Sequence, residues 1–92
     1  MKILVEVYGV LREIMGWKKM TYKVEDGLTV ASLLDLILEE YPKARDVILE
    51  GGAVKDYVKV LIDGRDFRFI EGLKTKLRDG SVVSIFPPAG GG

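Results

Sequence analysis

The fold is decided by the segment TVASLLDLILEEYP, residues 29–42. Its large apolar residues recur three and four positions apart, which is the period of an amphipathic helix with one buried stripe. The stripe consists of Val30, Leu33, Leu34, Ile37, Leu38 and Tyr41. Thr29 is a preferred N-cap residue, and Pro42 cannot continue a helix. The segment therefore predicts one helix over residues 30–41.

Two stretches before this helix alternate apolar and polar side chains, as a half-buried strand does. They are residues 2–8 and 19–25, which Gly9 and the pair Asp26-Gly27 bring to an end. The residues between them, 10–16, are read as a turn or a short helical connection. We expect the two strands to pair as a hairpin.

The chain after the helix has the same strand-like period. Residues 58–62 form one expected strand, and residues 65–69 form a short partner behind the turn Asp63-Gly64. A last strand is expected at residues 81–86. The remaining stretch, residues 43–57, is read as a polar and irregular connection.

This order of elements predicts an α+β roll, because a single amphipathic helix must bury its stripe against a sheet. The strands supply a matching apolar face, made of Ile3, Val5, Val7, Val58, Val60, Ile62, Val83 and Ile85. The sequence has no internal repeat and no linker between domains. We expect one domain over residues 1–86 and a flexible tail over residues 87–92.

The composition excludes several classes of function. The 92 residues contain 14 Lys plus Arg and 14 Asp plus Glu, and a chain without surplus positive charge is not expected to bind nucleic acid. Because the sequence has no Cys and no His, it offers neither a thiolate nucleophile nor an imidazole base or metal ligand. No apolar run is long enough to span a membrane, and the first residues do not resemble a signal peptide, so the cytoplasm is the expected location.

The most specific feature is the ending Pro87-Pro88-Ala89-Gly90-Gly91-Gly92. Neither proline can pair in a sheet, since each lacks a backbone N–H, and together they favour an extended exit from the last strand. The glycines have no Cβ, and six extended residues span about 20 Å. A glycine-rich end is often only solvated chain. Directly behind a strand and two prolines, however, this one is suited to threading into a narrow channel of a partner.

Several stretches together resemble the molybdopterin synthase small subunits (MoaD), within the MoaD and ThiS superfamily of ubiquitin-like sulfur carriers. They are Leu11-Arg12-Glu13 with Gly16, Leu28-Thr29-Val30 with Leu33-Leu34, Val60 to Arg65, Asp79-Gly80, and Ile85-Phe86-Pro87-Pro88 leading to Gly91-Gly92. One departure is Gly90, where the family commonly has another small residue. The resemblance implies a β-grasp (ubiquitin-like) roll, with a mixed four- to five-stranded sheet on one main helix.

The resemblance also implies a chemistry for the terminal carboxylate of Gly92. An adenylating enzyme of the ubiquitin-activating type joins it to AMP from Mg-ATP, and a sulfur donor then displaces AMP to leave a thiocarboxylate. The large subunit of molybdopterin synthase receives the sulfur. Gly90 and Gly91 would thread into the partners, and Pro87-Pro88 would form the stem. The chain itself would catalyse nothing and would hold no cofactor or metal.

Four apolar residues fall on the sheet face opposite the expected helix: Leu4, Leu61, Val82 and Phe86. They are either scattered surface residues or a docking patch for the adenylating enzyme and the large subunit. Phe86 lies nearest the tail and is the strongest candidate for such a contact.

Two other functions remain open on the same sequence. A ubiquitin-like protein modifier uses the same fold, tail and activation, but its last glycine is joined to a lysine. A plain β-grasp interaction module would carry the glycine tail without using it. Among sulfur carriers, the length, residues 43–57 and the Phe-Pro-Pro stem favour the molybdopterin branch over thiamine synthesis.

Overall fold

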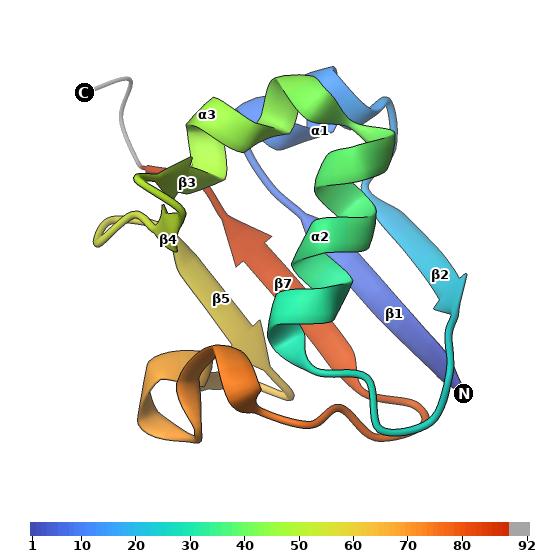
Figure 1. The fold of residues 1–92 in the computed structure, drawn as a ribbon. Helices are drawn as coiled ribbons and strands as arrows, with labels where there is room; N and C mark the ends of the chain where they lie inside the picture. The colour runs from blue at the N-terminus through green and yellow to red at the C-terminus, as the bar shows by residue number, and fades with distance from the viewer. Residues whose placement is uncertain (89–92) are drawn as a thin grey trace.

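A computed structural model describes residues 1–88 of the protein. Five strands form one mixed sheet in the order β2-β1-β7-β5-β6, and helix α2 crosses one of its faces (Figure 1). The strands are β1 (Lys2–Val7), β2 (Lys19–Lys23), β5 (Lys59–Ile62), β6 (Arg65–Asp66) and β7 (Val82–Phe86). The fold is the α+β, ubiquitin-like β-grasp roll that the sequence predicts.

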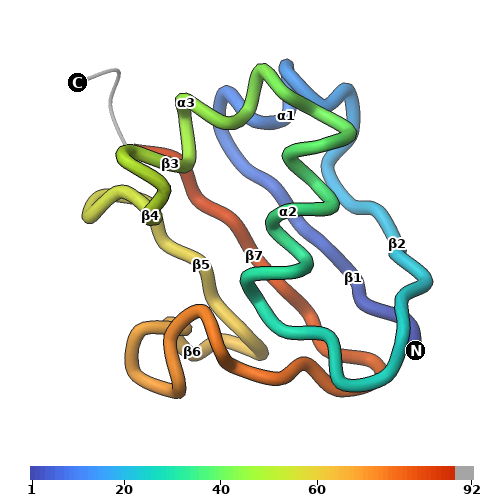
Figure 2. Tube along the Cα trace, in the orientation of Figure 1, coloured from blue at the N-terminus to red at the C-terminus, as the bar shows by residue number. Residues whose placement is uncertain are grey.

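The two ends of the described chain meet in the middle of the sheet. β1 and β7 pair in parallel, with Leu4 beside Val82 and Val7 beside Ile85. Figure 2 shows these two segments running side by side in the same direction. β2 pairs with β1, and β5 with β7, both antiparallel, as does β6 with β5. The last strand is therefore central, and Pro87 and Pro88, which follow it, leave from the middle of the sheet.

Helix α2 (Val30–Glu40) follows the predicted capping pattern. The Thr29 side chain accepts a hydrogen bond from the Ser32 N–H, which satisfies one of the free donors at the start of the helix. The helix ends one residue before the predicted end, at Glu40. Tyr41 is half-buried, and its hydroxyl accepts a hydrogen bond of 2.8 Å from the Trp17 indole N–H.

The core lies between α2 and the inner face of the sheet. The predicted stripe is buried on α2 from Val30 to Leu38, and all eight residues of the predicted sheet face are at most 6% exposed. Burial of this apolar surface provides the main force that holds the layers together. Both assignments from the sequence are confirmed.

Residues 43–57 are more regular than the sequence predicts. They contain the end of a 3₁₀ turn, η1 (Pro42–Ala44), then α3 (Arg45–Ile48) and a hairpin of β3 (Leu49–Glu50) and β4 (Ala53–Val54). Ala44 and Ile48, four positions apart, are both fully buried and fix the short helix against the core. The prediction of an irregular connection was wrong because these elements are too short to show a period.

The other connections agree with the sequence in part. Residues 10–16 contain the expected short helix, α1 (Val10–Met15). The expected strand over residues 65–69 stops at Asp66, and Phe67–Phe69 form the 3₁₀ turn η2, because the buried Phe67 turns into the core. A further turn, η3 (Gly72–Lys74), leads toward β7. In the described part of the chain, no helix has the length and apolar character needed to cross a bilayer.

Candidate functional site

The tail stem begins where the central strand β7 ends. Pro87 and Pro88 are half-buried, and the pairing of β1 with β7 continues to this point, since the Tyr8 N–H donates to the Ile85 carbonyl at 3.2 Å. Gly9 lies against the stem: a Cβ added to Gly9 would come within 2.8 Å of Pro87 Cγ. Gly9 and the Pro87 ring therefore approach too closely to leave room for a side chain on Gly9, a contact that the sequence did not reveal.

An aromatic stack stands beside the stem. The rings of Phe86 and Tyr8 are parallel to within 5°, with centroids 4.2 Å apart. The guanidinium of Arg12 lies 4.8 Å from the centre of the Tyr8 ring, and its Nε donates to the Val7 carbonyl at 2.8 Å. Phe86 was predicted as a contact residue and Tyr8 was not; Arg12 was interpreted as an ordinary solvated residue, with a polar contact to a partner as the alternative. Tyr8 continues the alternation of Leu4 and Glu6, and that signal could have placed it on the outer face.

Glu6 also holds the Tyr8 side chain in place. The Tyr8 hydroxyl donates to the Glu6 carboxylate at 2.8 Å. This hydrogen bond is the largest of the influences that raise the pKa of Tyr8 above its usual value of 10.0. Tyr8 is therefore a neutral, fixed ring beside the stem near neutral pH.

The structure places the four predicted patch residues on the outer face, each half-buried. Leu4 and Val82 are direct neighbours across the parallel pair, and Leu61 stands opposite Ser84 on the adjoining strand. Ser84 and Glu6 form a polar row between the Leu4–Val82 pair and Phe86. The patch is thus divided: Phe86 belongs with Tyr8 at the stem, and the other apolar residues lie farther along the sheet.

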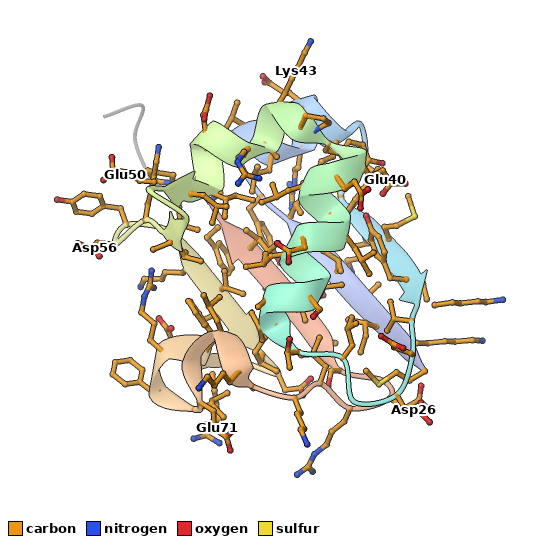
Figure 3. All side chains as sticks on the ribbon, viewed as in Figure 1. Asp26, Glu40, Lys43, Glu50, Asp56 and Glu71 are labelled. Atoms are coloured by element: carbon orange, nitrogen blue, oxygen red, sulfur yellow. The ribbon has the colours of Figure 1, made fainter. Side chains whose placement is uncertain are left out.

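A cavity of about 420 Å³ opens at the base of the stem. Its lining consists of Glu50, Ala53, Val54, Lys55, Asp56, Tyr57 and Pro88. Tyr57 is 81% exposed, and Figure 3 shows Glu50 and Asp56 on the same side of the molecule as the start of the tail. Arg68 anchors this loop, since its guanidinium donates to the carbonyls of Lys55 and Val58. The β3–β4 hairpin therefore borders the stem.

The predicted threading and reacting residues Gly90, Gly91 and Gly92 lie outside the described residues. Within residues 1–88, no group of three or more acidic side chains is arranged to hold a metal ion. The described site consists of a rigid stem, an aromatic stack and a bordering hairpin.

Comparisons with known proteins agree with this geometry. Residues 5–92 match the model of the ThiS family. Small archaeal modifier protein 3 of Haloferax volcanii is 36% identical over 92 residues, which is the full length of both chains. A putative sulfur carrier protein of Archaeoglobus fulgidus is 36% identical over 66 residues, covering 71% of this chain and 75% of that protein.

A solved structure extends the likeness to the molybdopterin branch. It is a putative molybdopterin converting factor, subunit 1, from Pyrococcus furiosus, with a TM-score of 0.78 and 25% identity. The match covers 96% of this chain and 98% of that one. The family model spans nearly the whole sequence, so the chain belongs to the ThiS family, whose ubiquitin-like fold it shares.

Proposed function

We propose that this protein is a ubiquitin-like modifier, joined through the carboxylate of Gly92 to lysine side chains of other proteins. The observation that carries the proposal is the stem: Pro87 follows the central strand β7 and packs closely on Gly9, and three glycines come after it in the sequence. The full-length likeness to small archaeal modifier protein 3 supports this function over the molybdopterin assignment, for which the structural relative is only 25% identical.

The reaction needs an activating partner. A terminal carboxylate has a pKa of about 3.3–3.7, so it is ionised near neutral pH and is a poor acyl donor. We propose that its oxygen attacks the α-phosphorus of Mg-ATP on an adenylating enzyme, and pyrophosphate leaves. A lysine amine then attacks the acyl adenylate, AMP leaves, and the amine loses a proton as the isopeptide bond forms. The chain contributes the acyl group, and its partner contributes the catalytic residues.

The outer face beside the stem is the proposed docking surface for that enzyme. The Tyr8–Phe86 stack adjoins Pro87, so an enzyme that binds the stack also receives the tail. Flat aromatic side chains of this kind are common energetic centres of protein interfaces. Leu4 and Val82 extend the contact along the same face. We propose the cytoplasm as the location, because the reaction consumes ATP.

Sulfur transfer is the second candidate, and the match to the putative sulfur carrier favours it. The adenylate would be the same, but a sulfur donor would displace AMP and leave a thiocarboxylate on Gly92. Delivery to the large subunit of molybdopterin synthase is one form of this function. The two functions share their activation and differ in the nucleophile that follows.

Mass spectrometry separates them. The protein is incubated with its adenylating enzyme, Mg-ATP, a sulfide donor and candidate target proteins, and a chain that stops after Pro88 is the matched control. A modifier leaves target lysines carrying the tryptic fragment that begins at Asp79, because Arg78 is the last tryptic site in the chain. A sulfur carrier instead gains the mass difference between oxygen and sulfur. If the full-length chain shows neither product under conditions that activate a known substrate, both proposals are rejected.

A further inference from the structure

A cavity of about 260 Å³ lies at the end of the sheet away from the stem. One of its lining residues, Ile62, stands opposite Val83 near the start of β7, whereas Phe86, at the other end of β7, precedes the stem. Figure 1 shows the neighbouring turns η2 and η3, in orange, at the end of β5 away from the β3–β4 hairpin. The cavity is therefore remote from the site that the tail uses, and it is called the basic cavity below.

Basic side chains dominate the lining of this cavity. Arg65 lies on β6, and Lys76 and Arg78 lie on the stretch that leads into β7; all three are exposed. The lining has one carboxylate, Asp63, whose Oδ1 accepts a hydrogen bond of 2.8 Å from the Val82 N–H. Among the described residues, none of the three basic side chains forms an ion pair. The cavity thus carries positive charge that the described domain does not pair.

The three basic residues stand on backbone that other elements hold in place. Arg65 pairs with the last residue of β5. Lys76 forms an antiparallel bridge with Thr29, the N-cap residue of α2, and the Arg78 N–H donates to Ser81 Oγ at 3.1 Å. Binding to groups on ordered backbone costs less conformational entropy than binding to a loose segment. The cavity is therefore a prepared site for an anionic group.

The rest of the lining is apolar or already hydrogen-bonded. Ile62 is buried and Ile70 is half-buried. Thr75 is also buried, and its hydroxyl donates to the Gly72 carbonyl at 2.7 Å and accepts from the Glu71 N–H at 3.0 Å. These three lining residues offer apolar contact but no free hydrogen-bonding side chain. A ligand that fits the cavity combines negative charge with an apolar group.

We propose that the basic cavity binds an acidic segment of a partner protein, in which an apolar residue is flanked by glutamate or aspartate. Arg65 and Arg78 match a carboxylate in shape as well as in charge, because a guanidinium presents parallel N–H donors. The apolar side chain of the segment would cover Ile62 and Ile70 and so remove apolar surface from water. The volume of the cavity suits one such side chain with its acidic neighbours.

Nucleic acid is a poor occupant of the same cavity. A nucleic acid strand carries a charge on every nucleotide, whereas this chain has no surplus of positive charge. Asp63 lines the cavity and Asp79 directly follows Arg78, so a continuous phosphate backbone would meet carboxylates on its path. A peptide can place neutral residues opposite these carboxylates. The mixture of charges around the cavity therefore favours a protein segment.

The basic cavity and the stem lie at opposite ends of β7, so a partner in the cavity leaves the tail and the Tyr8–Phe86 stack free. A receptor can therefore hold the protein while its tail is engaged elsewhere. The inference goes beyond the proposed function and does not depend on which nucleophile that function uses.

Three synthetic peptides test the proposal against the full chain. The probe is acetyl-Gly-Glu-Glu-Leu-Glu-Glu-Gly-amide. One control replaces every glutamate by glutamine, and the other replaces the leucine by serine. We expect the glutamine peptide to bind at least about tenfold more weakly, because the charge-assisted hydrogen bonds are lost, and the serine peptide about threefold more weakly. In NMR, the probe should shift the amide signals of Arg65, Lys76 and Arg78, and its affinity should fall as the salt concentration rises.

Variants of the full chain locate the contact. Arg65→Gln and Arg78→Gln each remove one guanidinium from the lining, and each should weaken probe binding about fivefold. Arg45→Gln is the matched control, because Arg45 is likewise exposed, on α3, but does not line the cavity. It should leave probe binding unchanged. Because all three arginines are exposed, we expect the variants to fold, which their amide spectra check.

Four results would overturn the proposal. The first is no probe binding at millimolar concentration, and the second is equal binding of the probe and the glutamine peptide. The third is an equal loss of affinity in Arg45→Gln and in the two cavity variants, which would mean that the probe responds only to the overall charge. The fourth is tighter binding of a ten-nucleotide uridine RNA than of the probe at the same three amides, which would assign the cavity to a phosphate backbone.

Discussion

Gly9 is the residue that fixes the stem. Its φ of 58° and ψ of −139° belong to a region that residues with a Cβ rarely adopt, and an added Cβ would lie 2.8 Å from Pro87 Cγ. We expect Gly9→Ala to lower the free energy of unfolding by about 3 kcal/mol. Urea denaturation measures this loss. In the same variant, displacement of the stem should slow adenylation of Gly92.

Gly27→Ala is the control for this substitution. Gly27 also has a positive φ, of 80°, but nothing lies within 4 Å of its added Cβ. We expect Gly27→Ala to lower the free energy of unfolding by about 1 kcal/mol and to leave the rate of adenylation unchanged. Equal rates for the two variants would show that the contact between Gly9 and Pro87 does not direct the tail.

Phe86 is the residue expected to contribute most to docking. Phe86→Ala removes one ring of the stack with Tyr8, and we expect the KM of the adenylating enzyme for this protein to rise about tenfold. Phe69→Ala is the matched control, because Phe69 is 81% exposed and lies in η2, far along the chain from the stem. ATP–pyrophosphate exchange measures the KM for both variants. A similar KM for the two variants would show that the Tyr8–Phe86 stack is not part of the docking surface.

At the scale of elements, Tyr22 links strand β2 to helix α2. Its hydroxyl donates to Glu40 at 2.9 Å, and burial, followed by this hydrogen bond, raises the pKa of Tyr22 well above 10.0. The folded protein therefore keeps this proton at a pH where the unfolded chain loses it. Stability from Tyr22 is fully present below pH 10 and falls as the pH rises beyond it.

Tyr22→Phe tests this link. We expect the free energy of unfolding of this variant to be about 1 kcal/mol lower at pH 7 and to decline less steeply above pH 10. Urea denaturation between pH 7 and pH 11 measures both effects. Tyr57→Phe is the control, since the Tyr57 side chain is 81% exposed, and it should reproduce the parent curve. A decline as steep as the parent's in Tyr22→Phe would contradict the assignment.

The elements that the sequence predicts are those with a full period. Helix α2 repeats its apolar spacing over three turns, and β1 alternates over six residues, so burial alone determines both. α3 has four residues and β3 only two, and their placement depends on the burial of Ala44 and Ile48. Such tertiary contacts leave no periodic signal. The same limit hid the contact between Gly9 and Pro87, since it requires the register of strands from opposite ends of the chain.

At the scale of the whole molecule, the parallel pairing of β1 with β7 joins the two ends of the domain and places the stem, Pro87-Pro88, at the end of a central strand. The last described strand ends at Phe86, and we expect folding and reaction to depend on separate parts of the chain. A chain that stops after Pro88 should keep its free energy of unfolding within about 0.5 kcal/mol and lose all modification.

A chain that stops after Ile85 provides the contrast. It removes Phe86, together with its stack on Tyr8 and its place opposite Lys59, and it removes Pro87 from Gly9. We expect the free energy of unfolding to fall by at least about 2 kcal/mol, because the packing of the Tyr8 ring is lost and the strand is shortened. Urea denaturation of the two truncated chains makes the comparison. A large loss already at the longer truncation would mean that the glycine tail stabilises the domain, and the separation of fold from reacting end would be wrong.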